Sequence, residues 1–133
     1  MTKRFNLIII SSSWGELDWI LPYIYYRKKN YDENLISYMA KELNKIPHIM
    51  CEKPNGAFYV FPGFEYYLNK TTANDKIIQT SSDLSLYILD QTGVVTVAGD
   101  SFGAPNNIRL SYATSDAIII EACKRIKSAL GKL

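Results

Sequence analysis

Residues 93–113 read GVVTVAGDSFGAPNNIRLSYA, and this stretch decides the fold. Residues 94–97 (VVTV) and 108–112 (IRLSY) are rich in β-branched and aromatic side chains, which indicates two strands. Residues 99–107 hold two glycines and a proline, which is typical of a connecting loop. Two neighbouring strands predict a sheet, and the flanking segments must supply the layer that covers it.

A helix, a turn and a third strand are predicted before this stretch. In residues 31–44, apolar side chains recur at steps of three and four, which puts them on one helix face, and Pro47 follows the end of this helix. Residues 53–56 (KPNG) predict a turn, and residues 57–61 (AFYVF) predict a strand. The polar residues 65–81 are interpreted as mainly loop.

Two further helices frame the decisive stretch. Ser82 and Asp83 are predicted to cap a helix that Gly93 terminates. Thr114 and Ser115 offer side-chain oxygens to the free amides at the start of the last helix. The buried stripe of that last helix is predicted as Ile119, Ala122, Cys123, Ile126, Ala129 and Leu130.

The order of these elements predicts an α+β fold. It is a two-layer arrangement in which a small mixed or antiparallel sheet is covered on one side by helices. At 133 residues the chain has room for one ordinary domain. We place that domain at residues 23–133, and residues 1–22 form an N-terminal segment without a recognisable motif.

Composition excludes several classes of function. Fifteen basic and thirteen acidic residues leave a net charge of +2, too weak for a nucleic-acid or anionic-membrane surface. Two cysteines are too few for a disulfide framework and predict buried, reduced thiols. A single histidine excludes a histidine-rich metal cluster. The short apolar run near the amino terminus lacks a small-x-small cleavage pattern, so we expect a cytoplasmic protein without a signal peptide or a membrane span.

Arg109 is the candidate functional residue within the decisive stretch. Its guanidinium is permanently charged and presents a rigid fork of donors that matches a carboxylate. A charge on the exposed face of a sheet is the alternative interpretation. Residues 101–105 could line a pocket, although a plain connection between strands is favoured. The loop lacks the glycine spacing of a phosphate cradle.

Three segments carry a resemblance to a known family. Residues 53–59 (KPNGAFY), 93–103 (GVVTVAGDSFG) and 108–113 (IRLSYA) occur in this order. Together they resemble the carboxy-terminal small domain of fold-type I, pyridoxal-phosphate-dependent aminotransferases of class I/II, and the bacterial aspartate aminotransferases are the most similar group. The resemblance implies the aminotransferase small-domain fold. It also implies amino-group transfer between an amino acid, aspartate, and a 2-oxo acid, with pyridoxal 5'-phosphate as cofactor of the intact enzyme.

The resemblance also implies roles for individual residues. Arg109 would bind the α-carboxylate of the amino-acid or oxo-acid substrate, and Phe58 would lie close to the active site. The Schiff-base lysine of the family lies in an S-K-x-x-x-x-G-x-R-like stretch that these 133 residues do not contain. We therefore expect no catalytic residue, no metal site and no covalently held cofactor here.

Two interpretations of the function stay open. In the first, the chain is a substrate-binding part that works only with a large domain or a homodimer partner, and it is inactive in isolation. In the second, it is a non-catalytic remnant or an interaction module without a ligand. A fragment, a split gene or a decayed reading frame would each produce such a sequence.

Overall fold

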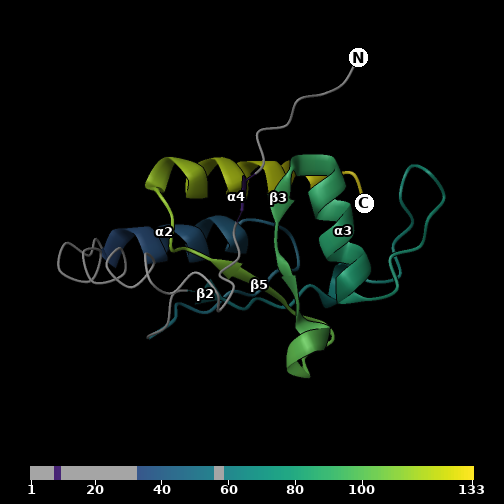
Figure 1. Cartoon of the computed structure of the whole chain (residues 1–133), viewed down its shortest axis with the longest axis horizontal. Coiled ribbons are helices and arrows are strands. Elements are labelled where there is room, and N and C mark those ends of the chain that lie inside the picture. The colour runs from purple at the N-terminus through teal and green to yellow at the C-terminus, as the bar shows by residue number, and fades with distance from the viewer. Residues whose placement is uncertain (1–7, 10–32, 56–58) are drawn as a thin grey trace, which may run out of the picture.

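The computed structural model describes residues 8–9, 33–55 and 59–133, and its elements are shown in Figure 1. Phe58 and most of residues 1–22 lie outside these ranges. The described elements are, in chain order, β1 (Ile8–Ile9), α2 (Glu33–Asn44), β2 (Tyr59–Val60), the 3-10 helix η2 (Glu65–Tyr67), α3 (Ser81–Thr92), β3 (Val94–Val95), β4 (Val97–Ala98), the 3-10 helix η3 (Gly99–Phe102), β5 (Ile108–Ser111) and α4 (Asp116–Leu130).

Strand β5 is the centre of an antiparallel sheet with the order β2-β5-β4. Val60 lies opposite Leu110, and Val97 lies opposite Arg109. The single strand predicted at residues 94–97 is wrong, because the chain changes pairing partners at Thr96. β3 pairs with β1 in parallel, whereas β4 pairs with β5.

The two faces of the sheet differ in burial. Ile108 and Leu110 alternate with Arg109 along β5, and both are fully buried while Arg109 is half-buried. Helices α2 and α4 lie together on one side of β5 in the view of Figure 1. The described part of the chain therefore confirms the predicted α+β fold, with a small antiparallel sheet and helices against its apolar face.

Helix α4 follows the sequence pattern closely. Its buried residues are the six predicted ones, and they face α2 and α3. Ser115 is the N-cap residue, but its side chain does not accept the predicted capping hydrogen bond. Asp116 in the first turn supplies a negative charge instead, which favours a helix amino terminus.

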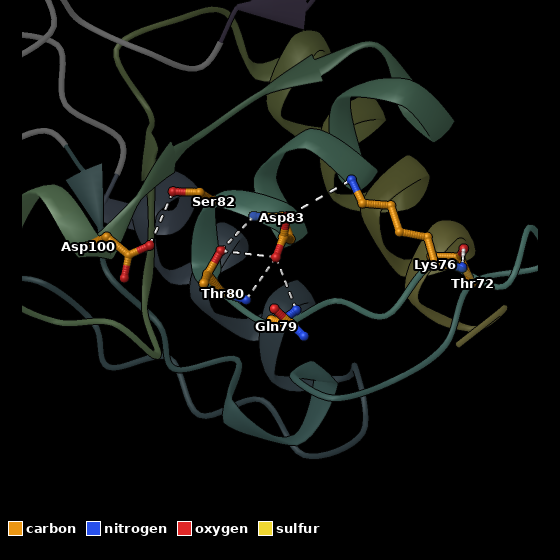
Figure 2. A network of polar contacts seen from close by, with 7 residues as sticks. All are labelled: Thr72, Lys76, Gln79, Thr80, Ser82, Asp83 and Asp100. Atoms are coloured by element: carbon orange, nitrogen blue, oxygen red, sulfur yellow. Dashed lines mark hydrogen bonds and ion pairs between the residues drawn. The ribbon is translucent and has the colours of Figure 1, made fainter.

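The N-cap of helix α3 lies two residues before Ser82, the first of its predicted caps. Thr80 is the N-cap, and its hydroxyl accepts a hydrogen bond from the amide of Asp83, while the Asp83 carboxylate accepts one from the amide of Thr80 (Figure 2). This reciprocal pair is a capping box. Ser82 is therefore not a cap, and Asp83 caps from the third helical position. Gly93 ends the helix with a left-handed φ of 71°, as predicted.

Residues 65–81 are more ordered than the predicted loop. They contain η2 and an isolated antiparallel bridge between Thr71 and Ile77. Tyr67 is buried, and its hydroxyl donates to the carbonyl of Pro47 at 2.8 Å. Ile78 is 1% exposed. Tyr67 and Ile78 thus anchor this polar segment to the core. The apolar periodicity of residues 65–81 is too weak to predict their burial.

Candidate functional site

Arg109 is held by strands on both sides. Its strand β5 pairs with β2 along one edge and with β4 along the other. Residues directly opposite each other in a sheet point to the same face, so Arg109 shares its face with Val97 and with the pair Tyr59–Ser111. This face is the one opposite the buried Ile108 and Leu110.

Two aromatic rings contact the Arg109 guanidinium. Its Cζ lies 4.6 Å from the ring centroid of Phe102 and 5.3 Å from that of Tyr59. Phe61 packs edge-on against Phe102, with centroids 6.0 Å apart. Such cation–π contacts are worth about 0.5–1 kcal/mol at exposed sites. The rings come from β2 and η3, so three separate segments converge on one cation.

Among the described residues, no group forms a hydrogen bond or ion pair with the polar edge of this guanidinium. The N–H donors of a guanidinium lie in its plane, so contact with ring faces does not consume them. The arrangement can therefore accept a carboxylate without first breaking an internal salt bridge.

The loop that carries Phe102 is closed by backbone hydrogen bonds. The Gly99 amide donates to the carbonyl of Asn107 at 2.8 Å, and the Ala104 amide donates to the carbonyl of Gly99 at 3.0 Å. A Cβ at Gly99 would lie 2.1 Å from the Ala104 carbonyl oxygen, so only glycine fits there. The loop also reaches α3, because the Ser82 hydroxyl donates to the Asp100 carboxylate at 3.1 Å (Figure 2).

The other chemically active side chains of the described residues do not join Arg109. Burial raises the pKa of Cys51 to about 11 and that of Cys123 to about 12, so both thiols stay protonated and free, as predicted. His48 is exposed and stacks on Tyr66 with centroids 3.7 Å apart. The described residues contain no group of three or more side chains that could hold a metal ion.

A separate pocket of about 270 Å³ lies between the carboxyl ends of α3 and α4. Its lining residues are Gln91, Thr92, Arg125, Ser128, Ala129 and Lys132, and none of them contacts Arg109. Arg125 spans it, since this side chain donates to the Thr92 carbonyl and pairs with Glu121. The pocket therefore does not extend the Arg109 site.

Comparison with known proteins identifies the family. The sequence profile of the family described as aminotransferase class I and II matches residues 30–126, which is most of the chain. The chain belongs to the class I and II aminotransferases. Arg109, Tyr59 and Phe102 all lie within the range that matches the family.

Individual aminotransferases are similar over different lengths. A probable aspartate/prephenate aminotransferase of Rhizobium leguminosarum bv. phaseoli is 42% identical over 89 residues, which are 67% of this chain and 22% of the relative. A probable aspartate/prephenate aminotransferase of Rickettsia felis is 36% identical over 128 residues, 96% of this chain and 30% of the relative. The crystal structure of the aspartate aminotransferase from Rhizobium meliloti superimposes with a TM-score of 0.73 and 38% identity, over 76% of this chain and 25% of that one. The chain thus spans less than a third of each of these relatives.

The described residues do not fit a pyridoxal phosphate site by themselves. The lysines with assigned contacts are engaged elsewhere: Lys45 pairs with Glu42, Lys76 pairs with Asp83, and Lys70 lies over the Tyr66 ring. None of these three contacts involves Arg109, Tyr59 or Phe102.

The sequence analysis named Arg109 as a candidate and did not predict the aromatic rings that contact it. Arg109 is half-buried and lies on the face of the sheet opposite Ile108 and Leu110. Phe58, the second candidate, lies outside the described residues, and the ring that contacts Arg109 is that of the next residue, Tyr59. Phe102 lies in the loop that was interpreted as a plain connection. An aromatic residue in a short loop directly before an arginine-bearing strand is the signal that could have indicated this contact.

Proposed function

We propose that this chain supplies the substrate-carboxylate-binding part of an aminotransferase, in which Arg109 binds the α-carboxylate of an amino acid or of its 2-oxo acid. The observation that carries this proposal is a guanidinium on a central strand with no protein partner for its donors among the described residues. Membership of the aminotransferase family supports the same role.

The chemistry follows from the geometry of the side chain. A guanidinium donates two parallel N–H···O bonds to a carboxylate, which fixes both the position and the plane of the substrate. Holding the reacting group in a fixed orientation lowers the barrier by reducing the entropy lost on reaction. Pyridoxal phosphate supplies the electron sink for amino-group transfer when it is bound in the complete enzyme.

The relatives support further parts of the proposal. Those named above carry aspartate in their names, so aspartate and its oxo acid are the proposed substrates. The cofactor lysine and the rest of the active site would come from a large domain or from a homodimer partner. Because the 133 residues lack the lysine motif, we propose that they do not transaminate alone.

Among the described residues, no helix has the length and apolar character needed to cross a bilayer. A cytoplasmic location is part of the proposal.

A binding titration tests the role of Arg109. We expect succinate, a dicarboxylate without an amino group, to shift the Arg109 Nε–H NMR signal of the ¹⁵N-labelled chain. The Arg109 variants lack this signal, so their succinate binding is measured by isothermal titration calorimetry. Arg109→Ala should abolish binding, and Arg109→Lys should weaken it about tenfold or more, because the charge stays but the fork is lost. The matched control is Arg125→Lys, which removes a guanidinium elsewhere and should leave binding unchanged.

Two outcomes would contradict the proposal. Equal succinate binding by Arg109→Ala and the unaltered chain would exclude the role of Arg109. Absence of any shift at saturating succinate would favour the alternative, a module without a ligand. The inactivity of the isolated chain is tested separately, by adding pyridoxal phosphate, aspartate and 2-oxoglutarate, and sustained turnover would show that it is wrong.

A further inference from the structure

The Phe102 ring makes the closer of the two contacts with Arg109. We propose that Phe102 is a positioning residue for Arg109, and that the hydrogen bond between Ser82 and Asp100 in turn holds Phe102 in place. The beginning of α3 would then set the orientation of the substrate-binding guanidinium. This inference rests on the proposed function of Arg109 for its biological meaning, whereas its geometry can be tested without any ligand.

Phe102 is held in place by its loop more than by packing. The ring is 49% exposed, and its assigned aromatic contacts are the Phe61 edge and the Arg109 guanidinium. A half-exposed side chain keeps its orientation only if its backbone is fixed, because the surrounding core does not confine it. The Gly103 backbone that follows has φ 70° and closes η3 by donating its amide to Asp100.

Asp100, two residues before Phe102, joins this loop to α3. Its amide donates to the Ser81 hydroxyl at 3.2 Å, and its carboxylate accepts from the Ser82 hydroxyl at 3.1 Å. We call these two hydrogen bonds the latch. Ser81 is 1% exposed, so the first bond is shielded from water, whereas Ser82 is exposed.

The latch is attached to a rigid point of the fold. Ser81 and Ser82 lie between Thr80 and Asp83, whose reciprocal hydrogen bonds form the capping box of α3. Figure 2 shows the Ser82–Asp100 hydrogen bond beside the capping box at this helix terminus. The capping box fixes the backbone at Ser81 and Ser82, and their hydrogen bonds hold Asp100. Because Asp100 and Phe102 lie in the same short turn, η3, this also restricts the position of Phe102.

The consequence for Arg109 is a preferred orientation. An arginine side chain is flexible, and a guanidinium seated against a ring loses part of that freedom before a substrate arrives. If Phe102 were freed or removed, the charge would stay and the orientation would be lost. We expect carboxylate affinity to fall about twofold to fivefold, the size of one exposed cation–π contact.

The experiment uses the ¹⁵N-labelled full chain, with and without succinate. The first readout is the Arg109 Nε–H chemical shift without ligand, which senses the ring current of Phe102. Phe102→Leu and Ser82→Ala should both move this signal toward the value of a free arginine and weaken succinate binding about twofold to fivefold. Phe102→Tyr should restore the signal, because it keeps the ring. Leu86→Ala and Ser128→Ala are the matched controls at exposed positions on α3 and α4, and they should leave the signal in place.

The outcomes separate this inference from the proposed function. An unmoved Arg109 signal in Phe102→Leu would overturn the positioning role. A moved signal in Phe102→Leu together with an unmoved one in Ser82→Ala would overturn the role proposed for the Ser82–Asp100 hydrogen bond. If the signal moves as expected but no variant, nor the unaltered chain, binds succinate, the positioning stands and the proposed function fails.

Discussion

Gly99 has no space for a side chain, and replacing it by alanine tests the closure of the loop before β5. The new Cβ would lie 2.1 Å from the Ala104 carbonyl oxygen and 2.4 Å from that of Asn107, whereas ordinary contact begins at 3.4 Å. The loop must therefore open by roughly 1 Å or more. Three backbone hydrogen bonds of 2.8–3.0 Å close it, from the amides of Gly99, Ala104 and Asn107. At a net 0.5–1.5 kcal/mol each, their loss would lower the free energy of unfolding by about 2–4 kcal/mol.

Urea unfolding at neutral pH measures this loss, as a fall in the midpoint of about 1–2 M. Two other glycines provide graded controls. Gly63→Ala meets no atom within 4 Å and should change the free energy of unfolding by less than about 0.5 kcal/mol. Gly103→Ala also has space, but its φ of 70° should cost about 1 kcal/mol. A Gly99→Ala chain as stable as Gly63→Ala would refute the steric argument.

Three further predictions concern the capping box, the thiols and the core. Hydrogen bonds from the backbone amide of Gln79, above all, and from that of Thr80 lower the pKa of Asp83 below 3.8. The stabilising effect of its carboxylate should therefore be complete above about pH 4 and disappear as the pH falls through the lowered pKa. The difference in urea midpoint between Asp83→Asn and the unaltered chain should then close in acid, and a constant difference would contradict this. Because burial raises the pKa values of Cys51 and Cys123 to about 11 and about 12, neither thiol should react with a disulfide reagent at pH 8 until urea unfolds the chain, and fast native labelling would show that they are accessible. Ile126 is 0% exposed, so Ile126→Ala should lower the free energy of unfolding by about 2–5 kcal/mol. Ile118 is 37% exposed, so Ile118→Ala should lower it clearly less. Equal losses would contradict the burial of this face of α4 in the core.

Long periodic segments were predictable, because burial alone decides them. The apolar stripe of α4 and the buried face of α2 at Met39, Ala40 and Leu43 both follow from helical spacing. Gly93 marked the end of α3, since a left-handed residue is required there.

The predictions that are wrong concern places where the local sequence allows several structures and a tertiary contact decides among them. Thr80, Ser82 and Asp83 can all cap a helix, and the sequence does not say which oxygen meets which amide. Residues 94–97 have uniform β propensity, yet the chain divides at Thr96 because two different strands lie beside its halves. Pairing partners far apart in sequence leave no trace in the local pattern.

In the candidate site, too, the local sequence indicated one residue and the tertiary contacts decided its neighbours. Arg109 was identifiable, since a charged residue between two apolar strand positions must face away from the core. Its contacts with Tyr59 and Phe102 were not, because they depend on the register of β2 against β5 and on the path of residues 99–107. Register is a property of paired strands and is specified only when both are placed.

The central place of β5 has a dynamic consequence. To release the backbone at Ile108–Ser111, the chain must separate two ladders at once, one to β2 and one to β4. Amide hydrogens in this strand should therefore exchange with solvent only through large opening events, near the limit set by global unfolding. The strand beneath Arg109 is thus a poor place for motion, and any adjustment to a bound acid must come from the side chain itself and the rings around it.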